Sequence, residues 1–167
     1  ADQRHAKEVG ELAMKYLDQY KSPRFLAFIH FADPDEAGHG RGMGSPEYSR
    51  AAVRCDNWLG KIVAWLKKEG LSDKTLIYVM ADHGFDDMGA KGHKNAPLSW
   101  LATNDKTVMR DGIIADVPVT IMERFGIDVD SLQPKLLGHT LSKPLPAGVK
   151  VPEIVVTPEK VQEKKTK

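Results

Sequence analysis

Residues 74–84, Lys-Thr-Leu-Ile-Tyr-Val-Met-Ala-Asp-His-Gly, form an apolar, β-branched run that ends in two side chains able to bind metals. The run lies between Gly70 and Ser72 on one side and Gly84 on the other, which predicts a buried strand over Thr75–Ala81. In open α/β sheets, ligands collect outside the carboxyl ends of the strands. We therefore expect Asp82 and His83 at a functional edge of a sheet.

A second apolar run, Phe25–Phe31, leads into another group of ligand-type residues, Asp33-Pro34-Asp35-Glu36-Ala37-Gly38-His39. Apolar runs without alternation are typical of parallel strands that are covered on both faces. A helix predicted between the two runs would make a βαβ crossover, which places both strand ends on the same side of the sheet. The predicted fold class is therefore α/β, a three-layer α/β/α domain with a mostly parallel sheet, in which these two strands are parallel neighbours or near neighbours.

In the remaining segments, capping residues, prolines and glycines mark where helices and strands should begin and end. Ser45-Pro46 and Gly70 predict the start and the stop of a long helix, and the four glycines of Ala32–Ser45 predict a loop. The other expected elements are a helix over Asp2–Tyr20 capped by Asp2, a third strand at Pro97–Thr103, a short helix from Asp116 to Gly126, a loop over Ser131–Pro146, an edge strand at Val149–Thr157 and a charged, frayed tail at Glu159–Lys167. We divide the chain into a catalytic-domain portion, residues 1–147, and an edge strand with a flexible tail, residues 148–167.

Bulk composition narrows the class of protein. The 167 residues suffice for one domain with a core, and a net charge of +1 gives no reason to expect a nucleic-acid partner. Cys55 is the only cysteine, which excludes an internal disulfide framework. No apolar run approaches the length of a membrane span, and no signal peptide opens this stretch.

The spacing of Asp35 and His39 predicts a metal site, because residues four apart share one face of a helix or compact turn. His93 can complete a three-ligand set with an open position, as in catalytic zinc sites. Asp82 and His83, adjacent at a strand end, are predicted to turn toward a second ion. Two ions about 3.5–4 Å apart can clamp the attacking and leaving oxygens of a displacement at phosphorus.

Several motifs together carry a family resemblance. Pro34-Asp35-Glu36-Ala37-Gly38-His39-Gly40, Glu47-Tyr48, Asp82-His83-Gly84 and Gly92-His93 resemble, in that order, the metal-binding motifs of the alkaline-phosphatase superfamily. The nearest branch is the type I phosphodiesterases and nucleotide pyrophosphatases, with a likeness to metal-dependent phosphomutases. The resemblance covers Phe25 to Leu145, and Leu137–Leu141 resembles the segment that closes the catalytic domain.

The resemblance implies hydrolysis of a small phosphate ester through a phospho-enzyme, with two divalent ions, zinc first and manganese as the alternative. Asp35, His39 and His93 would bind one ion, and Asp82 and His83 the other. The family's nucleophilic Thr or Ser and a further Asp ligand lie well upstream of this motif, and only 34 residues precede Asp35. We therefore expect the C-terminal half of an alkaline-phosphatase-like domain that lacks the nucleophile and is inactive alone. The family also implies a periplasmic or secreted location.

Other interpretations remain open at single residues. Asp-His-Gly can be a simple turn, in which the Asp hydrogen-bonds its own backbone. Lys91 and Lys94 either attract a substrate phosphate or belong to a solvated loop. His30 is expected as a packed sheet histidine or as a residue that supports the metal ligands, and Asp33 as the hydrogen-bonding residue of its loop.

Other activities also remain open. A sulfatase-like hydrolase or a phosphomutase would belong to the same superfamily, whereas a non-catalytic metal-binding module would not be an enzyme. As partners we expect the absent N-terminal half or another copy of the chain. They would cover an orphaned apolar surface whose candidate residues are Ala13, Tyr16, Tyr20, Trp58 and Trp65.

Overall fold

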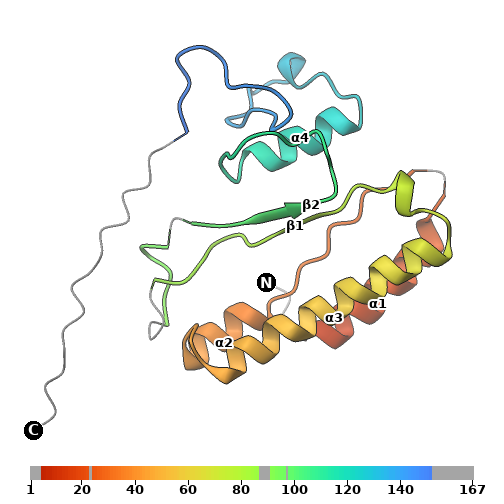
Figure 1. Ribbon diagram of the computed structural model, residues 1–167, viewed down its shortest axis with the longest axis vertical. Helices are drawn as coiled ribbons and strands as arrows, with labels where there is room; N and C mark the ends of the chain where they lie inside the picture. The colour runs from red at the N-terminus through yellow and green to blue at the C-terminus, as the bar shows by residue number, and fades with distance from the viewer. Residues whose placement is uncertain (1–4, 23, 87–90, 97, 152–167) are drawn as a thin grey trace, which may run out of the picture. The chain divides into compact units, whose positions relative to one another are not determined.

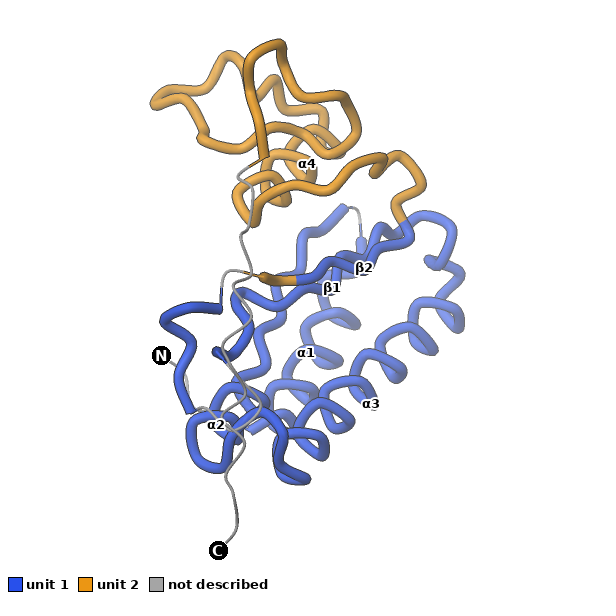
Figure 2. Tube along the Cα trace, turned by 60° about the vertical axis from the view of Figure 1, so that its left-hand side comes forward, with its two compact units in different colours: residues 1–96, 100–104 blue, residues 97–99, 105–167 orange. Residues whose placement is uncertain are grey.

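The computed structural model describes residues 5–22, 24–86, 91–96 and 98–151. The chain forms two compact units, one of residues 1–96 with 100–104, and one of residues 97–99 with 105–167 (Figure 2). The predicted N-cap Asp2, most of the edge strand and the charged tail lie outside the described residues.

Three helices build the first unit: α1 (Ala6–Tyr20), α2 (Asp33–Arg41) and α3 (Pro46–Lys68) (Figure 1). The long predicted helix is confirmed together with its boundary signals. The hydroxyl of Ser45 accepts a hydrogen bond from the backbone N–H of Tyr48 at 3.1 Å, so it caps the helix that Pro46 begins. Gly70 has φ +67°, the left-handed conformation that ends helices.

Helices α1 and α3 pack against each other around a small core. Leu17, Trp65 and Leu66 form its buried centre, with Trp65 only 8% exposed. The Trp58 ring lies so close to Gly10 that a Cβ at Gly10 would come within 2.0 Å of it. Trp65 and Ala13, each 8% exposed, therefore do not belong to the expected orphaned surface, whereas the half-buried Trp58 packs in part against α1.

Helix α2 replaces the predicted loop, and the reason is electrostatic. Each glycine in a helix costs about 1 kcal/mol relative to alanine. Here, however, Asp33, Asp35 and Glu36 lie in the first turn, a proline opens the helix, and basic side chains lie in the last turn. These positions complement the helix dipole and offset the glycine cost.

The predicted parallel sheet is wrong. Within the described residues the only sheet has two strands, β1 (Tyr78–Met80) and β2 (Leu101–Thr103), paired antiparallel with Tyr78 opposite Thr103. Residues 25–31 do not form a strand, and Phe28 is 90% exposed. An apolar segment forms a strand only where a neighbouring segment supplies partners for its backbone hydrogen bonds. The composition of the apolar segment does not identify that neighbouring segment.

Both strands are also shorter than predicted, three residues each. Asn104 extends the contact beyond the ladder, because its side chain accepts from the N–H of Ile77 at 2.7 Å and donates to the carbonyl of Thr75 at 2.9 Å. A 3-10 turn, η1 (Ser72–Lys74), connects α3 to this segment. The described part of the predicted edge strand, residues 149–151, has no strand structure.

The second unit is organised by a buried carboxylate at the start of α4 (Asp116–Arg124), the predicted short helix. Asp116 accepts hydrogen bonds from Arg110 Nη1 at 3.0 Å and from the N–H of His139 at 2.8 Å. Gly138 lies against the backbone of Ala115, where a Cβ would come within 2.0 Å of a carbonyl oxygen. The segment around His139 is thereby fixed to α4, and the 3-10 turn η2 (Val129–Ser131) precedes it. No described helix has both the length and the apolar character needed to cross a membrane.

Candidate metal centre

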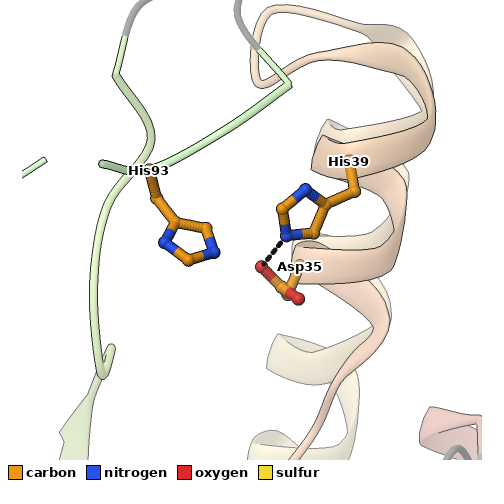
Figure 3. A group of neighbouring side chains, drawn as sticks. All are labelled: Asp35, His39 and His93. Atoms are coloured by element: carbon orange, nitrogen blue, oxygen red, sulfur yellow. Dashed lines mark ion pairs between the residues drawn. The ribbon is translucent and has the colours of Figure 1, made fainter. Parts of the chain in front are cut away.

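Asp35, His39 and His93 converge, as their spacing and order predict. The first two extend from the same side of α2, and His93 reaches them from the loop before β2 (Figure 3). One ligand-type atom from each of the three lies within 4.8 Å of those of the other two. The convergence arises because residues 35 and 39 are one helical turn apart, which places their side chains one above the other.

The orientation of His39 is fixed by the backbone. Its Nδ1 lies 2.6 Å from the carbonyl oxygen of Lys91. A carbonyl can only accept, so Nδ1 carries the hydrogen and Nε2 of the neutral ring carries the lone pair. That Nε2 lies 3.4 Å from Oδ1 of Asp35. A backbone carbonyl on the far nitrogen is the arrangement that usually orients metal-binding histidines.

Asp35 Oδ1 is the most informative atom of the cluster. The Asp35 side chain is 44% exposed as a whole, but Oδ1 itself is buried and has no hydrogen-bond partner within the described structure. Its 3.4 Å separation from His39 Nε2 exceeds the 2.7–3.2 Å of a normal N–H···O bond. Leaving a buried carboxylate oxygen unpaired is costly unless a cation satisfies it. The donor set therefore fits a divalent ion.

His83 approaches the same oxygen. Its Nε2 lies 3.9 Å from Asp35 Oδ1 and 3.7 Å from Asp82 Oδ2, while its Nδ1 lies 3.0 Å from the carbonyl oxygen of Gly84. The rings of His83 and His93 stack with centroids 4.0 Å apart. Four ligand-type side chains therefore cluster within one unit, all from segments that the sequence singled out.

The contacts of Asp82 fit both the simple turn and a role as a metal ligand. Its side chain is 73% exposed, and its Oδ1 accepts a hydrogen bond from the N–H of His83 at 3.1 Å. This is the backbone bond expected of the simple-turn interpretation. The other carboxylate oxygen of Asp82, Oδ2, lies 3.7 Å from Nε2 of His83, so the turn is compatible with a role for Asp82 as a metal ligand.

The remaining predicted residues fall into three groups. Lys91 and Lys94 are exposed, and Lys91 contributes its backbone carbonyl to His39. His30 is exposed, so the expectation of a packed sheet histidine is wrong. Asp33 is a buried hydrogen-bonding residue as expected, although its partners are Ala6 N–H at 2.7 Å and Arg54 Nε at 3.3 Å, in α1 and α3.

Phe85 is the residue that sequence reasoning missed. Its ring lies edge-on to three histidine rings, with centroid distances of 5.5 Å to His39, 6.0 Å to His93 and 6.3 Å to His83. Its position directly after Asp-His-Gly was the available signal, but an aromatic side chain there has no ligand chemistry of its own.

The type I phosphodiesterase / nucleotide pyrophosphatase family matches residues 2–156, and the chain belongs to that family and hence to the alkaline-phosphatase superfamily. It is a family of metal-dependent phosphoesterases.

Similar proteins carry several activities. A 2,3-bisphosphoglycerate-independent phosphoglycerate mutase of Wolbachia pipientis wMel is 30% identical over 126 residues, 70% of this chain and 24% of that protein. Steryl-sulfatase of Rattus norvegicus is 32% identical over 66% of this chain and 20% of that protein. Ectonucleotide pyrophosphatase/phosphodiesterase family member 3 of Mus musculus is 35% identical over 44% of this chain and 8% of that protein. The chain spans about a quarter or less of the length of these relatives. No solved structure matches it significantly.

Proposed function

We propose that this chain supplies the metal centre of a phosphoesterase that hydrolyses small phosphate esters. The observation that carries the proposal is the buried, unpartnered Oδ1 of Asp35, faced by Nε2 of His39. With the His39 ring neutral, these two atoms lie 3.4 Å apart and would both attract a cation placed among them. Membership of a family of metal-dependent phosphoesterases gives that cation a chemical purpose.

Asp35, His39 and His93 are proposed to hold one ion, and Asp82 with His83 a second. A mixed set of imidazole nitrogen and carboxylate oxygen suits zinc, with manganese as the alternative. A bound divalent ion supplies Lewis-acid polarisation of a phosphoryl oxygen. The carbonyls of Lys91 and Gly84 support this assignment, because they fix the tautomers of His39 and His83 with Nε2 free to ligate.

The remaining roles follow from charge and exposure. Lys91 and Lys94 are proposed to attract the substrate phosphate, because both are exposed and flank His93. No nucleophile is assigned, and we therefore expect negligible turnover of bis(p-nitrophenyl) phosphate by this chain, even with added zinc or manganese. Turnover that is abolished by Asp82→Ala would contradict this expectation and would require a nucleophile within the chain.

The metal proposal is tested by isothermal titration of zinc into the chain and its variants. Wild type should bind, and Asp35→Asn and His93→Ala should each weaken binding at least tenfold, since each removes a proposed ligand. His30→Ala is the matched control, because His30 is exposed on another segment of the same unit. Equal affinity for all four proteins would refute the proposed centre.

A phosphomutase is the second candidate, favoured by the alignment with a phosphoglycerate mutase over 70% of the chain. A longer protein that contains this chain would then isomerise a phosphoglycerate rather than release inorganic phosphate. Assaying such a protein for both products separates the two activities, and an aryl sulfate in a parallel assay tests for a sulfatase.

The chain is also proposed to associate with another polypeptide or with a second copy. Leu26 and Phe28 are large apolar side chains left exposed on the segment between α1 and α2. Exposed apolar surface tends to recruit a partner. Sedimentation at several concentrations should show self-association that Phe28→Ser reduces; a monomer throughout would contradict the second-copy form of this proposal.

A further inference from the structure

We propose that Phe85 is a positioning residue, which holds the rings of His39, His83 and His93 in their ligand orientations. The Phe85 ring occupies a space that exists only because residue 38 is a glycine. This inference rests on the proposed metal centre. It adds to that centre a residue without any ligand atom and gives a physical reason for a glycine between its first two ligands.

The first observation is that space itself. A Cβ built at Gly38 would lie 2.2 Å from Cζ of Phe85, and 2.6 and 2.8 Å from its two Cε atoms. Every side chain larger than hydrogen would therefore displace the end of this ring. Gly38 is buried in α2, one residue before His39, so the ring is wedged against the turn of helix that carries the ligands.

The second observation is the set of aromatic neighbours. Phe85 meets His39, His83 and His93 edge-on, with interplanar angles of 70°, 71° and 85°. Tyr48 of α3 closes another side at 5.8 Å and 85°. Edge-to-face contacts at these separations are the favoured aromatic geometry, and they contribute beyond simple burial.

The consequence is mechanical. The far nitrogens of His39 and His83 are fixed by carbonyls, but one hydrogen bond still allows a ring to swing about it. Within the described residues the His93 ring makes no such bond, so it is oriented by its stack on His83 and by its edge contacts with His39 and Phe85. Phe85 touches all three rings and α2 at once. Removing the ring should therefore loosen several ligands together.

The test is a size-exchange cycle with zinc titration. Phe85→Leu keeps an apolar side chain but removes the ring, and should weaken zinc binding about 10- to 100-fold, the usual effect of losing a residue that supports metal ligands. Gly38→Ala should weaken binding similarly in the wild-type background. In the Phe85→Leu background the same alanine should have little further effect, because the ring it displaces is gone.

Gly40→Ala is the matched control, because Gly40 lies in the same helix with no atom within 4 Å of a built Cβ. It should bind zinc as wild type does. If Gly38→Ala fails to fold, the comparison of Phe85→Leu with Gly40→Ala still decides the proposal. Wild-type affinity in Phe85→Leu would overturn the positioning role and leave the metal centre intact.

A second readout does not depend on activity or affinity. With Co²⁺ in place of zinc, the ligand-field absorption bands report ligand geometry, and Phe85→Leu should shift or broaden them at full metal occupancy. An unchanged cobalt spectrum in Phe85→Leu would by itself also refute the inference. Failure of wild type to bind either metal would refute the proposed function itself, and with it this role for Phe85.

Discussion

Asp33→Asn is the substitution with the largest predicted effect on stability outside the metal centre. The Asp33 side chain is 4% exposed and joins three helices, because it begins α2 and accepts from Ala6 N–H of α1 and from Arg54 of α3. Asparagine has the same shape but only one acceptor oxygen. Its NH₂ group would have to face a donor, so at least one of the two donors loses its partner.

The magnitude follows from the two contacts. An unpaired buried donor costs about 1–3 kcal/mol, and Ala6 is buried. The ion pair with Arg54 adds little, about 0–1 kcal/mol, because the Arg54 side chain is 53% exposed and screened by water. We expect a loss of about 2 kcal/mol in the free energy of unfolding.

Urea unfolding measures this loss. With a slope of about 2 kcal/mol per molar urea, the midpoint should fall by about 1 M in Asp33→Asn. Glu11→Gln is the control, because Glu11 is an exposed carboxylate whose ion-pair partner Lys7 lies 3.9 Å away, and its midpoint should hardly change. A midpoint for Asp33→Asn within error of wild type would refute the claim that this carboxylate ties the helices together.

Three further predictions concern local structure. Gly70→Ala should lower the free energy of unfolding by about 1–2 kcal/mol, because Gly70 has a left-handed φ of +67°. Gly60→Ala, at a position with open space within α3, should be neutral or stabilising, and urea midpoints measure both effects. Ser45→Ala should lower stability by about 1 kcal/mol and reduce helical circular dichroism, since it removes the N-cap of α3. A hydrogen bond from Lys143, with others from two hydroxyls, lowers the pKa of Glu123 from 4.5 to about 2. Its contribution to stability is therefore full above 4.5 and is lost as the pH falls toward 2, so Glu123→Gln should flatten the acid side of the stability profile.

Local signals predicted the helices that depend on local chemistry. Helix α3 begins at Pro46, after its cap Ser45, and ends before Gly70, as expected, because capping and helix-breaking residues act within one turn. The prediction of a loop in place of helix α2 was wrong because the acidic residues of the first turn offset the cost of its glycines. The sheet was missed for a different reason: strand pairing is non-local, and the apolar run of residues 75–81 finds its partner in residues 101–103 rather than in residues 25–31.

The candidate site divides in the same way. Asp35 and His39 follow from helical spacing alone, and His93 joined them through the order of motifs. Phe85 and the carbonyl of Lys91 could not be predicted, because nothing in the sequence states which ring fills the space above Gly38 or which carbonyl meets His39. These supporting contacts depend on the three-dimensional path of the loop.

X-ray absorption at the zinc edge of the zinc-loaded chain tests the central claim most directly. The account predicts a first shell of nitrogen and oxygen at about 2.0–2.2 Å. It also predicts outer-shell scattering from at least two imidazoles, which should decrease when His93 is replaced by alanine. A shell of oxygen alone, or an imidazole signal that His93→Ala leaves unchanged, would contradict the convergence of Asp35, His39 and His93 on one ion.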